Sequence, residues 1–242
     1  RGGKFYRWLV KKNMDLQSQV WFEGTPSLDI VKRISNTHLV YYPNYVVEEN
    51  IANVVSERPK DRINLCYFGR VTPEKNVDVV IKAFDMLCKK YDDVFLTIIG
   101  GSGFSKEYVK DIDAMIDNSP YKSHIVRKGL TPFAEIKEIM QSQHFFVFPS
   151  KERCEGHSNS LNEAMAQGLV PIVSDYHFNR AIVGDDRLIV DGYEPKAYAE
   201  KIDWLRNNCD MRALSLQMRD RVRDNFSFDI VNNRIYKELK KL

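Results

Sequence analysis

The stretch that decides the fold runs from Phe145-Phe146-Val147-Phe148-Pro149, through Glu155-Gly156-His157-Ser158-Asn159-Ser160-Leu161-Asn162-Glu163-Ala164-Met165-Ala166-Gln167-Gly168, to Val170-Pro171-Ile172-Val173-Ser174. The first and last runs are continuously apolar, which is typical of strands buried on both faces of a parallel sheet. Between them, Ser160–Gln167 predicts a helix that ends at Gly168, a residue suited to the position after a helix. The stretch therefore predicts a strand–helix–strand unit.

The same alternation extends on both sides of this unit, from residue 63 onward. We expect further strands at Ile63–Gly69, Val94–Ile99, His124–Arg127 and Leu188–Val190, and further helices at Val77–Tyr91, Lys106–Ile116 and Phe133–Met140. Strands alternating with helices in this way predict an α/β fold with a doubly wound, Rossmann-like parallel sheet. Three helices are expected to follow, at Pro195–Asn207, Met211–Asn225 and Phe228–Leu242.

The composition is that of a globular protein, with 43% hydrophobic and 29% charged residues in a chain of 242. No apolar run reaches the roughly 18 residues that a membrane-spanning helix needs. The net charge of +3 is too small to indicate nucleic-acid binding by itself. The four cysteines lack CxxC spacing, which favours reduced thiols and a cytoplasmic location over a disulfide framework.

Residues 1–44 do not follow the alternation, and we expect them to be a residual N-terminal segment with a linker. Aromatic residues there lie among basic ones, which permits two interpretations: a contact with an anionic membrane surface, or a helix with a solvated basic face. The residues concerned are Phe5, Tyr6 and Trp8, with Arg1, Lys4, Arg7, Lys11 and Lys12.

Two cations follow the first strand of the predicted sheet. Arg70 and Lys75 stand in the turn between Ile63–Gly69 and the next helix. Ligands of doubly wound sheets bind at the carboxyl ends of the strands, and guanidinium and ammonium groups both suit phosphate. The pair therefore indicates a diphosphate site, although an exposed turn with ordinary surface charges would have the same residues.

Two carboxylates, Glu155 and Glu163, frame the loop and helix start that follow the fourth strand. Carboxylates accept hydrogen bonds from sugar hydroxyls, and the free N–H groups of a helix start attract phosphate. Glu163 alone could also be a first-turn acid that stabilises its own helix. The run Gly100-Gly101-Ser102-Gly103 is weaker evidence, because Lys106 stands where the last glycine of GxGxxG would be.

These motifs together resemble retaining glycosyltransferases of the GT-B fold, family GT4, and the resemblance covers roughly residues 40–242. It rests on Gly69-Arg70-x4-Lys75, Gly100–Gly103, Pro149-Ser150, Glu155-x7-Glu163-Ala164-Met165-Ala166-x-Gly168 and Pro171–Asp175, with Pro43-Asn44 similar to the family's domain junction.

The resemblance implies a role for each matching residue. Arg70 and Lys75 would bind the diphosphate of a nucleotide-sugar donor, Glu155 the hydroxyls of its sugar, and Glu163 its ribose; Arg70, Lys75 and Glu155 are the expected catalytic residues. Leu130 would lie near the nucleobase. His157 stands where the family often has Phe, which alters the pocket wall. The remaining expected donor contacts are Gly69, Gly156, Ser158, Asn159 and Ser160.

The resemblance also implies the organisation of the molecule. Residues 45–225 would form the nucleotide-sugar-binding domain, the C-terminal half of a GT-B fold, and residues 226–242 a helix that packs back toward the N-terminal domain. An absent N-terminal domain would bind a saccharide or lipid-linked acceptor, so this chain alone is expected to be inactive.

The expected activity is hexosyl transfer in cell-surface polysaccharide or glycolipid synthesis, at the inner face of the membrane, with no cofactor and no metal ion. Two alternatives stay open: a nucleotide-sugar-binding module without turnover, and an epimerase or phosphorylase on a similar fold. Nucleic acid is not an expected partner.

Overall fold

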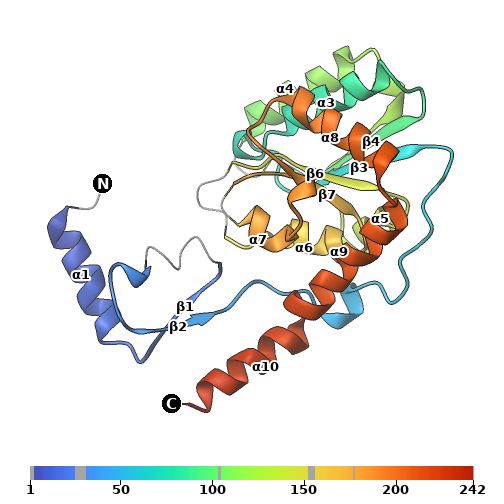
Figure 1. The fold of residues 1–242 in the computed structure, drawn as a ribbon. Coiled ribbons are helices and arrows are strands. Elements are labelled where there is room, and N and C mark those ends of the chain that lie inside the picture. The colour runs from blue at the N-terminus through green and yellow to red at the C-terminus, as the bar shows by residue number, and fades with distance from the viewer. Residues whose placement is uncertain (1–2, 25–30, 103–104, 152–155, 177, 242) are drawn as a thin grey trace.

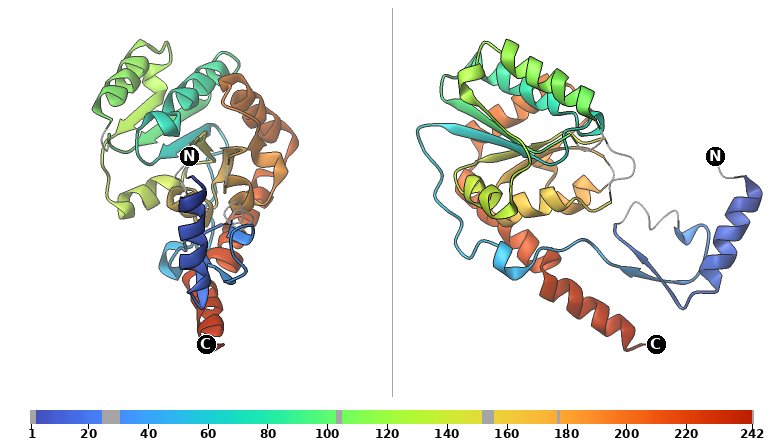
Figure 2. Two further views of the ribbon diagram at one scale, coloured as in Figure 1. Left: turned by 90° about the vertical axis from the view of Figure 1, so that its left-hand side faces the viewer. Right: turned by 180° about the vertical axis from the view of Figure 1, so that it is seen from behind.

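The structure is a computed structural model that describes residues 3–24, 31–102, 105–151, 156–176 and 178–241 (Figure 1). Most of the described chain folds into one α/β domain. The described residues up to Tyr41 form a separate projection, the N-terminal arm, which lies to one side of the domain in Figures 1 and 2.

The domain is built on a six-stranded parallel sheet with the order β5-β4-β3-β6-β7-β8. The strand bounds are β3 Ile63–Phe68, β4 Val94–Ile99, β5 Ile125–Lys128, β6 Phe145–Phe148, β7 Val170–Ser174 and β8 Ile189–Val190. Every residue of β6 and β7 is buried, as expected for continuously apolar strands that helices cover on both faces. The predicted α/β fold with a doubly wound parallel sheet is therefore confirmed.

Helices cover both faces of this sheet. Figure 1 shows α3, α4 and α8 above the sheet and α6, α7 and α9 below it, and contacts between α3 and α8 and between α6 and α9 join the connecting helices to the tail. The helix bounds are α3 Val77–Cys88, α4 Lys106–Asn118, α5 Phe133–Met140, α6 Asn159–Ala166, α7 Asn179–Val183, α8 Pro195–Asn208, α9 Met211–Phe226 and α10 Phe228–Leu239, with 3₁₀ turns at Glu48–Asn50, Pro73–Lys75, Lys122–His124 and Asp186–Leu188.

Local signals fix the ends of several helices. Helix α8 begins at Pro195, whose fixed φ suits a first helical position. Helix α6 is followed by Gly168 at φ 77°, and a Cβ there would meet Val55 Cγ1 at 2.7 Å. Both the left-handed backbone and the lack of space therefore require glycine at this position.

The N-terminal arm contains a helix, which was one of the two interpretations of its basic and aromatic residues, and a strand pair that the sequence did not predict. Helix α1 spans Lys4–Asp15, and strands β1 (Gln19–Phe22) and β2 (His38–Tyr41) form a parallel pair. The sequence does not predict the strand pair, because each strand is only four residues long and neither is fully buried. None of the described helices is long and apolar enough to cross a membrane.

The C-terminal helix α10 contacts this arm. The Gln19 side chain donates a hydrogen bond of 3.2 Å to the carbonyl of Glu238, and the Glu238 carboxylate lies 2.8 Å from His38 Nε2. The Arg234 guanidinium lies 5.3 Å from the centre of the Tyr41 ring. Segments at opposite ends of the chain are therefore packed together (Figure 1).

Candidate functional site

The strand order determines where the site lies. Strands β3 and β6 are neighbours, but the chain leaves β3 toward β4 on one side and leaves β6 toward β7 on the other. This reversal opens a crevice at the carboxyl ends of β3 and β6, the usual ligand position in doubly wound sheets. The loops that follow these two strands therefore form the candidate site.

Gly69 and Arg70 form the tight turn after β3. The Tyr67 hydroxyl donates a hydrogen bond of 2.6 Å to the Arg70 carbonyl, and the Gly69 N–H bonds the Ile99 carbonyl at 3.1 Å. Gly69 and Gly100 have φ of 146° and 137°, and a Cβ at Gly100 would overlap the Gly69 carbonyl. Only glycine fits this close approach of the two turns. The Arg70 side chain is exposed beside the crevice.

Lys75 lies one turn further along and has only 4% of its surface exposed. Its ammonium nitrogen is 5.1 Å from the centre of the Phe148 ring, within cation–π range. The next residue, Asn76, has a left-handed backbone with φ 50°, and its side chain donates a hydrogen bond of 2.8 Å to the Pro149 carbonyl. The turn after β3 is thus fastened to the loop after β6.

Helix α6 begins beside this turn. The Ser158 hydroxyl caps it by accepting the Leu161 N–H at 3.4 Å, and it lies 3.3 Å from the Ser160 hydroxyl. The Ser160 hydroxyl oxygen would lie 3.9 Å from a Cβ built on Gly69. The first N–H groups of α6, which carry the positive end of the helix dipole, therefore lie close to the glycine–arginine turn.

Glu163 lies on α6 after Ser158, Asn159 and Ser160, and its side chain is half-buried. Burial raises its pKa from 4.5 to about 7, because the ionised form loses hydration. The carboxyl group is thus held in a place that water solvates poorly, where an added hydrogen-bond donor would stabilise the charged form.

His157 faces away from the crevice. Its ring contacts the Phe226 ring edge-on, with 4.6 Å between the ring centres. Its Nδ1 lies 3.0 Å from the Asn162 side-chain nitrogen, and only 3% of the residue's surface is exposed. Burial, and then the positive Arg221, lowers its pKa to about 4, so the ring is neutral at pH 7. At this position, therefore, only the backbone of His157 is available to contact a ligand in the crevice.

Asn44 and Asn162 are two positioning residues that the sequence did not identify as parts of the site. The Asn44 side chain donates a hydrogen bond of 2.5 Å to the His157 carbonyl, and the Asn162 side chain donates one of 3.2 Å to the Asn44 carbonyl. Together they attach the linker to the start of α6. In the sequence, Pro43-Asn44 indicates only a domain junction, and the family motif around Asn162 is the signal that could have indicated its role.

A groove of about 470 Å³ runs from the turn after β3 toward β4 and β5. Leu130 lies on its wall with 91% of its surface exposed, and a Cβ built on Gly101 would be 3.0 Å from its Cγ. The groove is lined by Phe68, Gly69, Arg70, Ile99, Gly100, Gly101, Ser102, Leu130, Thr131 and Ile136.

The crevice thus gathers most of the expected contacts at one sheet edge, while Glu155 lies outside the described residues. The N-terminal arm reaches the same edge, because a Cβ on Gly156 would overlap the Glu23 carboxylate. Among the residues that the structure describes, no three or more His, Cys, Asp or Glu side chains gather as metal ligands would.

Comparison with known proteins decides the family. The family described as "Glycosyl transferases group 1" matches residues 47–223, which is most of the chain. The chain belongs to this family. One curated relative, an uncharacterised glycosyltransferase of Methanocaldococcus jannaschii, is 28% identical over 140 residues, covering 57% of this chain and 33% of the relative. A capsular polysaccharide biosynthesis glycosyltransferase of Staphylococcus aureus is 26% identical over 177 residues, covering 71% of this chain and 44% of the relative.

Solved structures share the fold. A glycosyltransferase from Rickettsia africae superposes with a TM-score of 0.84 at 17% identity, covering 100% of this chain and 68% of that one. The pneumococcal O-GlcNAc transferase GtfA, in complex with UDP and GlcNAc, gives a TM-score of 0.75 at 18% identity, covering 98% of this chain and 48% of that one. This chain spans less than half the length of these two curated relatives.

Proposed function

We propose that this chain is the donor-binding part of a retaining glycosyltransferase of family GT4, which moves a hexose from a nucleoside-diphosphate sugar to an acceptor hydroxyl. The observation that carries the proposal is the meeting of the start of α6 with the Gly69–Arg70 turn at one sheet edge. Family membership supports glycosyl transfer, and the crevice supplies groups of the kind that a nucleotide sugar needs.

The diphosphate would bind between the cations and the helix start. Arg70 and Lys75 supply positive charge, and the N–H groups of residues 156–160 supply hydrogen bonds to phosphate oxygens and to the sugar. Negative charge grows on the leaving diphosphate as the glycosidic bond breaks. Donors fixed in place before the reaction stabilise that charge without reorganisation, so no metal ion is required by the proposal.

The nucleoside would occupy the groove toward β4 and β5. Glu163 would accept hydrogen bonds from ribose hydroxyls, and its raised pKa fits a carboxyl group that lacks such donors when no ligand is bound. Leu130 would cover the base, since it is an exposed apolar side chain on the groove wall. The pneumococcal relative binds UDP, which makes a uridine nucleotide the first donor to test.

The acceptor would be a saccharide or a lipid-linked saccharide, brought to the sugar by parts of the protein outside the donor domain. The capsular polysaccharide role of the Staphylococcus aureus relative supports a saccharide acceptor. The Glu23 carboxylate of the N-terminal arm lies against Gly156 and would face a donor sugar bound there.

A thermal-shift screen tests the donor proposal directly. We expect UDP, GDP or ADP, or one of their sugar conjugates, to raise the melting temperature, because a ligand that binds only the folded state stabilises it by mass action. Sodium chloride at the same ionic strength is the control for screening, and the Arg70→Ala chain is the control for phosphate bound outside the crevice. A chain that none of these nucleotides stabilises would refute the proposal, whereas binding without sugar transfer by the full-length protein would favour the module without turnover.

A further inference from the structure

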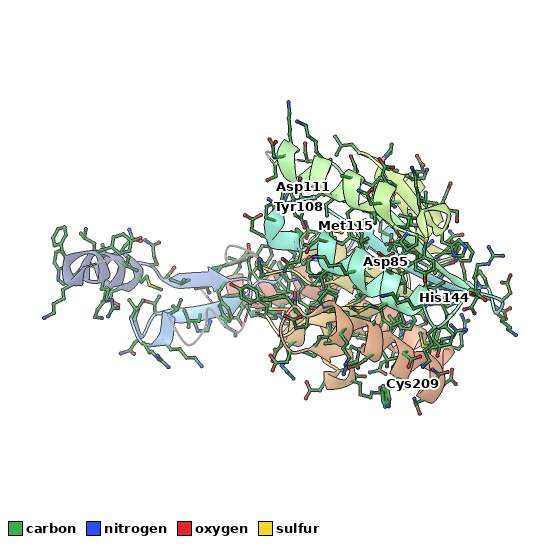
Figure 3. The ribbon with its side chains drawn as sticks, turned by 90° about the horizontal axis from the view of Figure 1, so that it is seen from above. Asp85, Tyr108, Asp111, Met115, His144 and Cys209 are labelled. Carbon is green, nitrogen blue, oxygen red and sulfur yellow. The ribbon has the colours of Figure 1, made fainter. Side chains whose placement is uncertain are left out.

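A second cavity lies at the opposite edge of the sheet, where β3 and β6 begin. Its volume is about 470 Å³, and we call it the amino-edge cavity. His144, which directly precedes β6, lies at the end of the domain away from the N-terminal arm (Figure 3). The lining residues are Ser56, Glu57, Arg58, Pro59, Lys60, Arg62, Ile63, His144, Arg206, Met211, Arg212 and Ser215.

Basic side chains dominate the amino-edge cavity, and two of them are neutralised within the protein. The Arg62 guanidinium pairs with Asp61 at 2.8 Å. The Arg206 guanidinium binds Asp93 through two nitrogens, one of them 3.0 Å from a carboxylate oxygen. These two arginines contribute shape to the cavity and little net charge.

Arg58 and Arg212 are bound differently, by neutral carbonyl oxygens. Arg58 Nη2 donates to the Gln167 carbonyl at 2.7 Å, and Arg212 Nη1 donates to the Val55 carbonyl at 2.7 Å. In the part of the chain that the structure describes, neither guanidinium forms an ion pair, and Arg58 Nε is buried without a hydrogen-bond partner. Lys60 adds a further exposed cation, against the single carboxylate of Glu57.

This arrangement leaves positive charge in a place that water solvates poorly. Burial, together with the nearby charge of Arg212, lowers the pKa of Arg58 to about 10. A buried group whose charge is not paired makes the folded state less stable, and an anion that enters the cavity removes that cost. Both terminal nitrogens of Arg58 already donate to carbonyls, of Gln141 and Gln167, and its Nε is buried. Lys60 and Arg212 are therefore the cations of the lining that an anion in the cavity would contact directly.

We propose that the amino-edge cavity is a second ligand site, which binds the phosphate group of an organic phosphate at the sheet edge opposite the crevice. Guanidinium forks match phosphate oxygens in pairs, and the cavity volume lies within the range of small-molecule sites. Ile63 and Met211 offer apolar surface for the organic part of the ligand. Buried His144 contributes shape and no charge, because its Nε2 lies 3.0 Å from the Pro59 carbonyl and burial lowers its pKa to about 4.

Calorimetric titration with pyrophosphate tests the site. The titration uses the Arg70→Ala chain, in which the crevice proposed for the donor diphosphate has lost its exposed cation. We expect Lys60→Glu and Arg212→Gln each to reduce the remaining pyrophosphate affinity by at least about ten-fold, the usual effect of losing or opposing a charged hydrogen bond. Arg223→Gln is the matched control, an exposed arginine further along α9 that pairs with Asp220, and it should change affinity less than two-fold.

Lys60→Glu keeps the test independent of folding, because Lys60 is exposed and its replacement removes no hydrogen bond that the structure describes. Affinity that stays the same in Lys60→Glu and Arg212→Gln overturns the proposal, as does the absence of any pyrophosphate binding in the Arg70→Ala chain. Co-sedimentation with phosphatidylglycerol vesicles then identifies the source of the phosphate. A loss of pelleting in Lys60→Glu assigns it to a lipid headgroup, and unchanged pelleting assigns it to a soluble ligand.

Discussion

Glu163 shows how one side chain can be costly for stability and suited to binding. Its carboxyl group is half-buried, and burial raises its pKa from 4.5 to about 7. The folded state therefore holds a proton between pH 4.5 and 7 that the unfolded state has released. Stability from this group is present below pH 4.5 and is lost as the pH rises through 7.

Replacing Glu163 by Gln removes this titration. We expect Glu163→Gln to raise the free energy of unfolding at pH 8 by about 1–3 kcal/mol and to leave it nearly unchanged at pH 4.5. The size of the effect follows from the difference of a few units between the folded and unfolded pKa of Glu163. Urea unfolding at pH 4.5, 6 and 8 measures this, with Glu138→Gln, at an exposed position on α5, as the control. A gain in stability that is equal at pH 4.5 and 8 would contradict the raised pKa.

Arg70 is the exposed cation of the crevice, and its removal should affect catalysis more than folding. In the full-length protein we expect Arg70→Ala to lower kcat by about 10²–10³, the usual effect of losing a fixed donor that stabilises transition-state charge. The melting temperature should change little, because the Arg70 side chain is exposed. Sugar transfer from a labelled donor measures the loss, with Arg223→Ala as the control. Near-normal transfer by Arg70→Ala would exclude the diphosphate role.

At the scale of elements, the sequence predicts the sheet well because the information is local. Continuously apolar runs mark β4 and β7 at their observed bounds, and β3 and β6 end one residue before the predicted ends. The parallel pair β1–β2 was missed, since strands of four residues with mixed burial carry no clear period.

Contacts distant in sequence could not be predicted from local pattern. The hydrogen bond from Asn44 to His157 spans 113 residues, and it depends on how the linker crosses the start of α6. The sequence motif indicated that the loop from Gly156 to Ser160 faces a ligand, but not that the His157 ring turns inward onto Phe226.

Asn162 joins helix α6 to the linker, and this contact is testable. We expect Asn162→Ala to lower the free energy of unfolding by about 1–3 kcal/mol, because the half-buried Asn44 carbonyl and the buried His157 Nδ1 lose their partner. Asn159→Ala, at the exposed first position of the same helix, is the matched control. Equal stability of the two variants in urea would show that the linker is held by other contacts.

At the scale of the molecule, the two edges of one sheet have different chemistry. The carboxyl edge combines a helix start, Arg70 and Glu163 beside a groove, whereas the amino edge gathers arginines around a cavity. A buried neutral histidine lies near each edge, His144 before β6 and His157 before α6, and burial lowers both pKa values to about 4. Each histidine is therefore expected to contribute less stability in acid, whereas Glu163 at the carboxyl edge acts in the opposite direction.

Acid sensitivity can be assigned to His157 with one substitution. Between pH 6.5 and 4 the unfolded state binds a proton at this histidine that the folded state does not, so the contribution of His157 to the free energy of unfolding falls as the pH falls. His157→Phe keeps a ring against Phe226 and removes the titration. We expect the slope of the free energy of unfolding against pH in this window to be smaller in His157→Phe than in the unsubstituted chain, by about 1.4 kcal/mol per pH unit. Urea unfolding at half-unit pH intervals measures the slope. His38→Gln, at an exposed position in the N-terminal arm, is the control, and an unchanged slope in His157→Phe would mean that His157 is protonated equally in both states.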